Sequence, residues 1–364
     1  MVKSMLKKQG TYIIAEAGVN HNGDIKLAKE LIDIAADAKA DAVKFQTFTP
    51  EEIISQNAQQ AEYQKENTGI EESQLDMIRK LELSKDDFKE LYEYSKDKDV
   101  TFLSTGFDSG SMSYLVKECD IPFIKIPSGE ITNAPYLFES AKHQLPIVLS
   151  TGMATMDEIR QALAVLSYGW MHGSKPESLK KCIDFYNTDE GASVLDGKIT
   201  ILHCVTEYPA PYSETNLNAM KAIAEEFKCP VGLSDHTLGI HVPVAAVAMG
   251  ANVIEKHFTI DKNMQGPDHK ASLDPVELKN MVKCIRDIED AMGDGIKKPQ
   301  TSEIKNIAVA RRSIVAAQDM AKGALYTNDN ITCKRPGSGI SAISYWDYLG
   351  KECPEDVKKD SLVK

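Results

Sequence analysis

Two histidines follow short apolar runs in the second half of the chain. His236 stands in GLSDHT and His257 in IEKHFT, and a helix-like segment separates the two runs. If the runs are neighbouring parallel strands, both imidazoles reach the same rim of a sheet. Neutral imidazole binds manganese, iron and zinc, and two protein ligands leave coordination positions open to water and substrate. The pair therefore predicts a divalent-metal site, although either histidine alone would more often be structural.

Two lysines end apolar runs elsewhere in the chain. Lys44 lies in DAVKFQ, two residues before Gln46, and Lys125 lies in PFIKI. An unpaired ammonium group is costly to bury, so these positions favour a bound anion over a purely structural role. The two charges would bracket a small dianion that carries phosphate or carboxylate groups.

Small hydroxyl side chains and one glutamate stand at further strand ends. Ser128 in KIPSGE, Ser150 in LSTG and Ser234 in LSDH would donate to an anion, or would only cap turns and helices. Glu16 in AEAGVNHNGD would orient substrate or transfer a proton. His21 in the same motif is interpreted as part of a turn and helix cap, not as a third metal ligand.

These side chains occur at the ends of eight apolar or β-branched runs. The runs lie at 12–17, 41–46, 100–104, 122–126, 146–150, 198–204, 230–234 and 252–258, with helix-period segments such as 25–40, 85–98, 155–168 and 217–228 between them. This alternation predicts a parallel sheet, either a closed (β/α)₈ barrel or an open doubly wound sheet. Polar groups at nearly every strand end favour the barrel, because there all of these ends face one cavity.

Two long segments and a C-terminal module extend the pattern. Residues 49–75 follow the second run and are expected to cover the substrate, whereas residues 168–197 are expected to form a peripheral insertion. A domain at 1–294 would be followed by a linker at 295–304. Residues 305–364 would then form a small β-rich domain, because short strand-like pieces alternate there with KG, ND, PG and SG turns.

The composition restricts the classes of partner. The 364 residues are 42% hydrophobic and 26% charged, with a formal net charge of −12, which argues against a nucleic-acid partner. Without a membrane-spanning apolar run or a signal-peptide pattern, a cytoplasmic protein is expected. The seven scattered cysteines lack a CxxC motif and are expected to be reduced. Cys204 is interpreted as a small buried residue in preference to a nucleophile.

Ten motifs in the chain resemble, in order, those of the sialic acid synthase family, which comprises N-acetylneuraminate synthase and its legionaminate and pseudaminate relatives. They are AEAGVNHNGD, VKFQTF, FLSTGF, KIPSGEITN, LSTGMAT, LHCVTEYPAP, GLSDHT, IEKHFT, GPDHKAS and KRPGSGIS. The resemblance extends over essentially the whole chain and is therefore specific. It implies an α/β fold, a (β/α)₈ TIM barrel followed by a small β-rich antifreeze-like (SAF, β-clip) domain.

The resemblance implies condensation of phosphoenolpyruvate with an N-acylated mannosamine-type sugar and water, with release of phosphate. N-acetylmannosamine is the first acceptor expected, and the product would be N-acetylneuraminate. The alternative is an N,N'-diacetyllegionaminate synthase that uses 2,4-diacetamido-2,4,6-trideoxymannose. A synthase of another keto-deoxy sugar acid is more distant, because a phosphorylated acceptor needs a second basic site. A non-catalytic carbohydrate-binding protein would leave the strand-end residues unexplained.

The resemblance also assigns roles to residues within these motifs. Catalytic roles fall on Glu16, His236 and His257, and the two histidines would bind Mn²⁺, with Mg²⁺ or Co²⁺ as alternatives. Phosphoenolpyruvate would be held by Lys44, Thr105, Lys125, Ser128, Ser150, Thr206 and Ser234. The sugar would be held by Gln46, Phe107, Glu130, Tyr208 and Asp268. In a domain-swapped homodimer, Arg335 would reach the active site of the other subunit and contact the acyl group of the sugar.

Three features depart from the common family pattern. Gly106 in STGF stands where proline is frequent, and Thr206 stands where asparagine can contact phosphate. The insertion at 168–197 is longer than usual. These differences affect the rigidity of one loop and one phosphate contact, and they leave the lysines and histidines intact.

Overall fold

Eight parallel strands form the central sheet of the first part of the chain. The structure is a computed structural model and describes residues 10–69 and 71–364. The strands are β1 (Tyr12–Gly18), β2 (Ala42–Thr47), β3 (Thr101–Gly106), β4 (Ile124–Ile126), β5 (Ile147–Ser150), β6 (Ile199–Cys204), β7 (Val231–Asp235) and β8 (Val253–His257). They are ordered β3-β2-β1-β8-β7-β6-β5-β4, and β3 also contacts β4, so the sheet closes on itself. The predicted (β/α)₈ barrel is confirmed.

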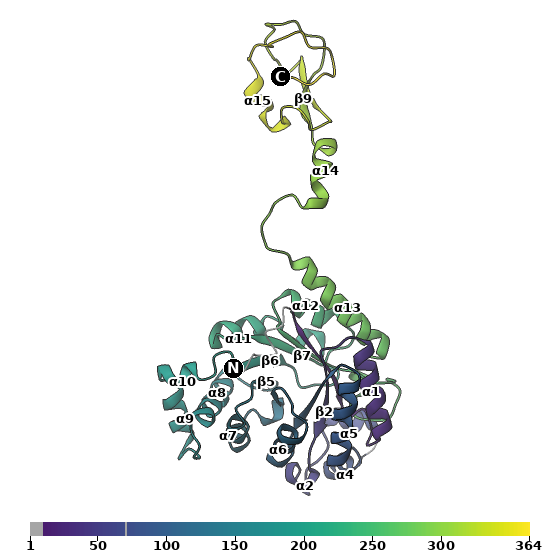
Figure 1. The fold of residues 1–364 in the computed structure, drawn as a ribbon, viewed down its shortest axis with the longest axis vertical. Coiled ribbons are helices and arrows are strands. Elements are labelled where there is room, and N and C mark those ends of the chain that lie inside the picture. The colour runs from purple at the N-terminus through teal and green to yellow at the C-terminus, as the bar shows by residue number, and fades with distance from the viewer. Residues whose placement is uncertain (1–9, 70) are drawn as a thin grey trace. The chain divides into compact units, whose positions relative to one another are not determined.

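Helices surround the strands of the barrel (Figure 1). Each strand is followed along the chain by one main helix. These helices are α1 (Ile25–Asp37), α5 (Lys85–Asp97), α6 (Ser109–Glu118), α7 (Ala134–Lys142), α8 (Met156–Met171), α11 (Ala219–Phe227), α12 (His241–Ala248) and α13 (Pro275–Met292). In α1 the buried residues Ala28, Leu31, Ile32 and Ala35 follow the helical repeat and form one apolar face. The side chain of Asp24 accepts a hydrogen bond from the backbone of Lys26, which fixes where this helix begins.

Two groups of short helices interrupt the regular alternation. α2 (Pro50–Ile53), α3 (Glu62–Thr68) and α4 (Gln74–Arg79) lie between β2 and α5. α9 (Leu179–Tyr186) and α10 (Asp189–Ser193) pack against α8, where Cys182 is fully buried and Ser167 donates to the carbonyl of Gly191 at 2.7 Å. The insertion at 168–197 therefore has packed helical structure of its own. Single 3₁₀ turns occur at η2 (Ser128–Glu130), η3 (Tyr212–Glu214) and η4 (His269–Ala271).

The second part of the chain is a small separate unit. Contacts divide the chain after Gly293, and the second unit is Asp294–Lys364. It contains α14 (Thr301–Ala310), the antiparallel pair β9 (Ser313–Ala316) and β10 (Ile331–Lys334), η5 (Ala342–Ser344) and α15 (Tyr345–Tyr348). Its core includes Ile314, Tyr326 and Val357. The predicted β-rich module is confirmed, but the expected boundary at residue 304 falls inside α14.

A buried ion pair joins strands β7 and β8 on their outward face. Lys256 and Asp235 are 2.5 Å apart, and their side chains are 0% and 1% exposed. Lys256 also donates to the carbonyl of Thr237, and Asp235 accepts from the backbone N–H and the hydroxyl of Thr237. Each charge is therefore hydrogen-bonded as well as paired, which is what makes a buried ion pair tolerable.

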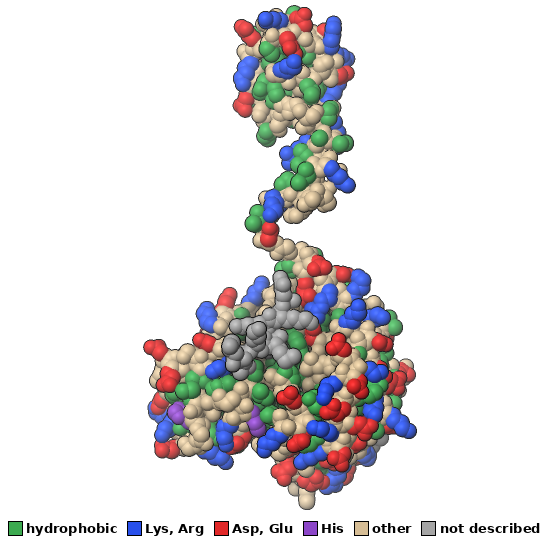
Figure 2. All heavy atoms as spheres, in the orientation of Figure 1, with side chains coloured by type: hydrophobic (Ala, Val, Ile, Leu, Met, Phe, Trp, Pro, Cys, Tyr) green, Lys and Arg blue, Asp and Glu red, His purple; other side chains and the backbone are tan. Residues whose placement is uncertain are grey.

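The surface is that of a mixed-charge protein. Acidic and basic side chains are interspersed over the face of the first unit that Figure 2 shows. All seven cysteines are free. Within residues 10–69 and 71–364, no helix combines the length and apolar character needed to cross a membrane.

We predict that Lys256→Met lowers the free energy of unfolding by about 3–5 kcal/mol, because it leaves the Asp235 carboxylate buried without its partner. Lys283→Met is the matched control, since it breaks an exposed pair with Asp287 and should change that free energy by less than about 1 kcal/mol. Urea unfolding followed by circular dichroism measures both. Equal small losses in the two variants would contradict a structural role for the Lys256–Asp235 pair.

Candidate active site

A cavity of about 410 Å³ opens at the carboxyl ends of the barrel strands. Residues from the ends of all eight strands, or from the loops that follow them, line it. The lining includes every residue of the barrel that the sequence proposed for the site: Glu16, Lys44, Gln46, Thr105, Phe107, Lys125, Ser128, Glu130, Ser150, Thr206, Tyr208, Ser234, His236, His257 and Asp268. Arg335 belongs to the second unit, and its contact with a partner's site stays a prediction.

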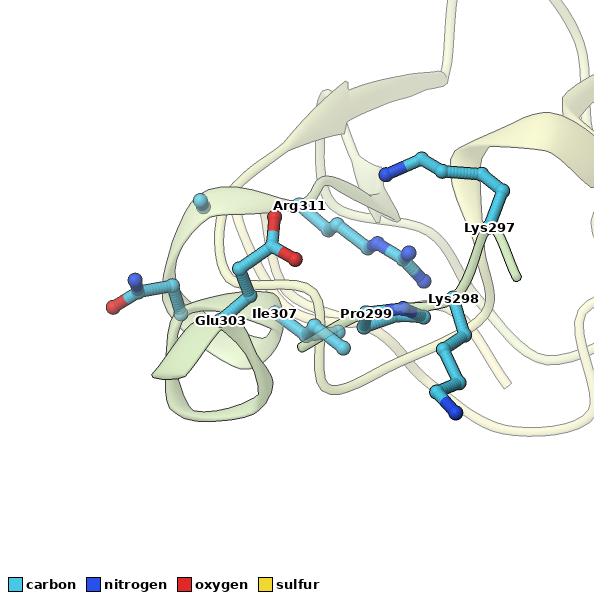
Figure 3. Close-up of a pocket in the computed structure, with 8 residues that line it drawn as sticks. Lys297, Lys298, Pro299, Glu303, Ile307 and Arg311 are labelled. Carbon is cyan, nitrogen blue, oxygen red and sulfur yellow. The ribbon is translucent and has the colours of Figure 1, made fainter. Parts of the chain in front are cut away.

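A hollow in the second unit has a different character (Figure 3). It is lined by Lys297, Lys298, Glu303 and Arg311, whose side chains are all exposed. Figure 3 shows the side chains of Lys297 and Lys298 diverging from the chain, so their charges do not converge on one point. The barrel cavity, with its buried charges, is therefore the better candidate for an active site.

Four charged side chains form a buried charge cluster at the base of the barrel cavity. Lys44 lies 2.6 Å from Glu16 and 3.7 Å from Glu255, and Lys125 lies 3.2 Å from Glu255. These four side chains are only 2% to 6% exposed. Strands β1, β2, β4 and β8 each contribute one of them, and the closed sheet brings the four together. The cluster thus places two cations where an anionic substrate can enter.

Burial and mutual charge shift the titration of this cluster. Burial raises the pKa of Glu16 to about 7, with Glu255 adding to the rise and Lys44 opposing it. Although burial alone would raise the pKa of Glu255, Lys125 and Lys44 hold it at about 2. Burial lowers the pKa of Lys125. Burial also opposes the charge of Lys44, but Glu16 and Glu255 together outweigh it and raise the pKa of Lys44. Glu16 is therefore the member able to exchange a proton near neutral pH.

A row of hydroxyl groups continues from the cluster along strands β3 to β7. Lys44 donates to Thr105 at 2.9 Å, and Ser234 donates to Glu255 at 2.9 Å. The buried hydroxyl oxygens of Ser150 and Thr206 have no hydrogen-bond partner within the described structure. Unpaired buried hydroxyls in a cavity that also contains two lysines are suited to the oxygens of a bound anion.

Gly152 allows these hydroxyls to come close together. Its backbone N–H donates to Ser128 at 2.9 Å. A Cβ atom at this position would lie 2.1 Å from the Thr206 hydroxyl and 2.8 Å from that of Ser128. Any side chain here would therefore fill the space between the two hydroxyls.

A steric constraint also explains why residue 106 is glycine. A Cβ atom there would lie 2.7 Å from the backbone nitrogen of Met112 at the start of α6. Tyr136 also donates its hydroxyl to the Gly106 carbonyl. Close packing of α6 on β3 and the Tyr136 hydrogen bond thus hold this loop without the proline that is frequent in the family.

The two histidines lie close together in the part of the cavity lined by the ends of β7 and β8. The rings of His236 and His257 have centroids 5.5 Å apart, and Tyr208 packs on His236 with a centroid distance of 4.0 Å. The Nδ1 atom of His236 lies 2.6 Å from the carbonyl of Val205. When Nδ1 donates to this carbonyl, Nε2 keeps a free lone pair.

The donor set of this histidine pair fits a metal ion with open positions. Burial lowers the pKa of His257 well below its ordinary value, which keeps the imidazole neutral, and its Nδ1 atom has no hydrogen-bond partner among the described residues. Asp268 lies 3.9 Å from that atom, and burial raises its pKa to about 6. No group of three or more such ligands is found in the described chain. His236 and His257 would therefore leave most coordination positions to water and substrate.

The segment 49–75 borders the cavity, as expected for a substrate cover. Ile53, Ile54, Gln64 and Gln74 contribute to the lining. Asn67 donates to the carbonyl of Pro267 at 2.7 Å, and its amide nitrogen lies 3.4 Å from the carbonyl of Tyr208. These contacts connect the segment to the loops after β6 and β8, across the barrel mouth.

Some residues of the cavity were missing from the sequence-based site. Glu255 is not among the residues proposed from the sequence, although it lies two residues before His257 and so faces the same side of β8. The apolar residues Val19, Phe48 and Ile78 gave no signal, because apolar residues near strand ends are ordinary core candidates. His21 lies outside the lining, and its Nδ1 atom accepts from the backbone of Gly23 at 3.0 Å.

We predict a pH-dependent stability difference between the wild type and Glu16→Gln. Because the pKa of Glu16 is raised to about 7, protonated Glu16 stabilises the fold below its ordinary pKa, and this stabilisation is lost as the pH rises through about 7. When the pH rises from about 5 to about 8, the melting temperature of the wild type should therefore fall further than that of Glu16→Gln. Differential scanning calorimetry in chelator tests this, and parallel losses would contradict the raised pKa.

Comparisons with known proteins agree with the motifs and the fold. The NeuB family model matches residues 31–297, and the SAF domain model matches residues 311–364. An N,N'-diacetyllegionaminic acid synthase of Campylobacter jejuni is 51% identical, over 97% of this chain and 99% of that protein. One of Legionella pneumophila is 46% identical, over 93% and 89%. The crystal structure of an N-acetylneuraminic acid (sialic acid) synthetase of Leptospira borgpetersenii with citrate is 35% identical, has a TM-score of 0.66 and matches 82% of this chain and 90% of that chain. The chain therefore belongs to the NeuB family and ends in a SAF domain.

Proposed function

We propose that this protein is an N,N'-diacetyllegionaminate synthase. It would condense phosphoenolpyruvate with 2,4-diacetamido-2,4,6-trideoxymannose and water and release phosphate. The observation that carries the proposal is the placement of two buried lysines, a row of hydroxyls and two histidines in one cavity. This arrangement offers one anchor for a phosphorylated anion and another for a metal-activated carbonyl.

Phosphoenolpyruvate fits the lysine side of the cavity. Its carboxylate and phosphate are two anionic groups a few ångströms apart, and Lys44 and Lys125, on strands β2 and β4, line the same cavity as the unpaired hydroxyls of Ser150 and Thr206. Both ammonium groups already face carboxylates, which keeps the empty site close to electrical balance. The bound anion would gain charge-assisted hydrogen bonds without leaving a lone buried lysine in the free protein.

The acceptor aldehyde fits the histidine side. A divalent cation held by His236 and His257, with Mn²⁺ as the first candidate and Mg²⁺ or Co²⁺ as alternatives, would polarise the aldehyde oxygen. Tyr208 packs against both imidazole rings, with centroid distances of 4.0 and 5.6 Å, and so restricts their orientation. The nearby carboxyl group of Asp268 would accept a hydrogen bond from a hydroxyl of the acceptor.

The reaction then follows from these positions. Carbon 3 of phosphoenolpyruvate forms a bond to the aldehyde carbon, and the aldehyde oxygen takes up a proton to become a hydroxyl. Water adds to carbon 2, which has become electron-poor, and loses a proton. The bond between carbon 2 and the phosphate oxygen breaks, phosphate leaves with the bonding electron pair, and the carbon 2 hydroxyl loses its proton, so a 2-keto acid remains. Glu16, with its pKa raised to about 7, would move one of these protons.

The choice of acceptor rests on the comparisons and on the cavity. The two relatives reported above that bear the legionaminic acid synthase name are 51% and 46% identical, against 35% for the sialic acid synthetase. They favour the sequence-based alternative over N-acetylmannosamine. A phosphorylated aldose is disfavoured, since the cations of the described lining are Lys44 and Lys125, and both already face carboxylates.

A domain-swapped homodimer would complete the site. In this arrangement Arg335, an exposed residue after β10, would contact the acyl group of the acceptor in the partner subunit. Its guanidinium Nε donates to the Ala310 carbonyl at 3.0 Å, which leaves the terminal nitrogens available for such a contact.

The acceptor comparison tests the proposed function. Phosphate release is measured with phosphoenolpyruvate, Mn²⁺ and either 2,4-diacetamido-2,4,6-trideoxymannose or N-acetylmannosamine. We expect kcat/KM to be at least about tenfold higher for the diacetamido sugar, because the two acceptors differ at two substituents. Phosphate release with neither acceptor would refute the synthase, and faster release with N-acetylmannosamine would refute the acceptor assignment.

The same assay tests whether the reaction requires a metal bound by the two histidines. Chelation should abolish phosphate release, and added Mn²⁺ should restore it in the wild type but not in a variant with both His236→Ala and His257→Ala. His21→Ala is the matched control, because His21 lies outside the lining, and its activity should be restored.

A further inference from the structure

The lining of the barrel cavity divides into two sectors of different chemistry. The hydroxyl sector comprises Ser128, Ser150, Thr206 and Ser234, which lie at or after β4, β5, β6 and β7. The apolar sector comprises Val19, Phe48, Ile54, Ile78 and Phe107, which come from the segments that follow β1, β2 and β3. In the order of the strands around the barrel, β8 with Glu255 and His257 separates the two sectors on one side, whereas Glu16 and Lys44 lie on β1 and β2 and precede Val19 and Phe48 of the apolar sector along the chain.

The apolar sector is supported by packing separate from the main core. Val19 and Phe48 are buried in a small cluster with Leu81, and Ile78 and Phe107 pack against it. The rings of Phe48 and Phe107 meet edge to face, with centroids 6.4 Å apart. These side chains therefore support one another and still border the cavity. Ile54 lies outside this cluster and lines the cavity without belonging to it.

Apart from Glu16, Lys44 and Thr105 on the strands themselves, the described polar lining supplied by β1, β2, β3 and the segments that follow them consists of amides. Gln46, Gln64 and Gln74 border the same part of the cavity, from β2, α3 and α4. A phosphate on the distal end of an acceptor would find no cation supplied by α2, α3 or α4 to the described lining. Amides can pair with amide or hydroxyl groups of a sugar, while the isoleucines and phenylalanines favour methyl groups.

The position of the reacting atoms fixes which end of the acceptor meets this sector. In the proposed reaction, phosphoenolpyruvate binds to the lysines and the hydroxyl sector. The aldehyde carbon of the acceptor must then lie near the histidines and next to carbon 3 of phosphoenolpyruvate. The rest of the acceptor must then extend into the remaining part of the cavity, whose wall is the apolar sector. The distal substituents of the sugar are those at carbons 4 and 6.

We propose that the apolar sector is the specificity subsite of this enzyme, and that it takes the carbon 6 methyl group and the methyl of the 4-acetamido group of the acceptor. This inference rests on the proposed function. An acceptor with hydroxyls at carbons 4 and 6 would place polar groups against isoleucine and phenylalanine, where they would lose hydrogen bonds to water. The segment from α2 to α4 thus selects the acceptor as well as covering it.

Paired substitutions to valine and threonine test this subsite, because the two side chains have the same shape and differ by a hydroxyl in place of a methyl. Ile54→Val and Ile78→Val should keep kcat/KM for 2,4-diacetamido-2,4,6-trideoxymannose within about threefold of the wild type. Ile54→Thr and Ile78→Thr should lower it by about tenfold relative to the valine variants. The KM for phosphoenolpyruvate should stay unchanged in all four.

The competing sugar and the melting temperature complete the experiment. With N-acetylmannosamine, the threonine variants should equal or exceed the valine variants, because a wall hydroxyl can pair with a sugar hydroxyl. Melting temperatures identify any loss of packing at Ile78, and Ile54, outside the cluster, gives an independent test. Equal kinetics of the threonine and valine variants with both sugars would overturn the subsite. If the wild type acts on neither sugar, the proposed function itself has failed.

Discussion

The pairing of Lys44 and Lys125 with Glu16 and Glu255 is the interaction on which the rest of the site depends. Two ammonium groups buried at a barrel mouth would be very unfavourable without nearby negative charge. Glu255 contacts both lysines and Glu16 contacts Lys44, so the cluster is neutral in total charge if all four groups are ionised. Only a closed sheet brings β1, β2, β4 and β8 to one point. The fold thus supplies cations for a substrate and the carboxylates that make those cations tolerable.

Strand β8 shows how alternation distributes these tasks. Glu255 and His257 face the cavity, where one pairs with the lysines and the other stands opposite His236. Lys256, between them, points to the outside of the barrel and pairs with Asp235. Asp235, the last residue of β7, in turn precedes His236. The ion pair on one face of these two strands therefore joins the residues adjacent to both histidines on the other face.

Much of this arrangement follows from sequence pattern alone. Strand and helix periods predict the barrel, and polar residues such as Lys44, Lys125 and His257 at strand ends predict where the site lies, because parallel strands in a barrel end at one rim. The requirement for glycine at 152 and 106 could not be predicted this way, because it comes from three-dimensional contacts, with Thr206 far along the chain and with the backbone of Met112 in the first turn of α6. The apolar sector could not be predicted either, because it forms only when β1, β2 and β3 bring the segments that follow them together. The domain boundary predicted at residue 304 from composition falls inside α14.

In the proposed site the lysines bind phosphoenolpyruvate and the histidines bind the metal, so the two binding events are separable. Calorimetric titration of phosphoenolpyruvate in metal-free buffer tests this separation most directly, with folded Lys125→Met and His257→Ala compared with the wild type. We predict that Lys125→Met weakens phosphoenolpyruvate binding by about a hundredfold, because one buried charged contact is lost, whereas the affinity of His257→Ala stays within about threefold of the wild type. Equal losses in the two variants, or tight binding to Lys125→Met, would contradict the assignment of the lysines to the anion and the histidines to the acceptor.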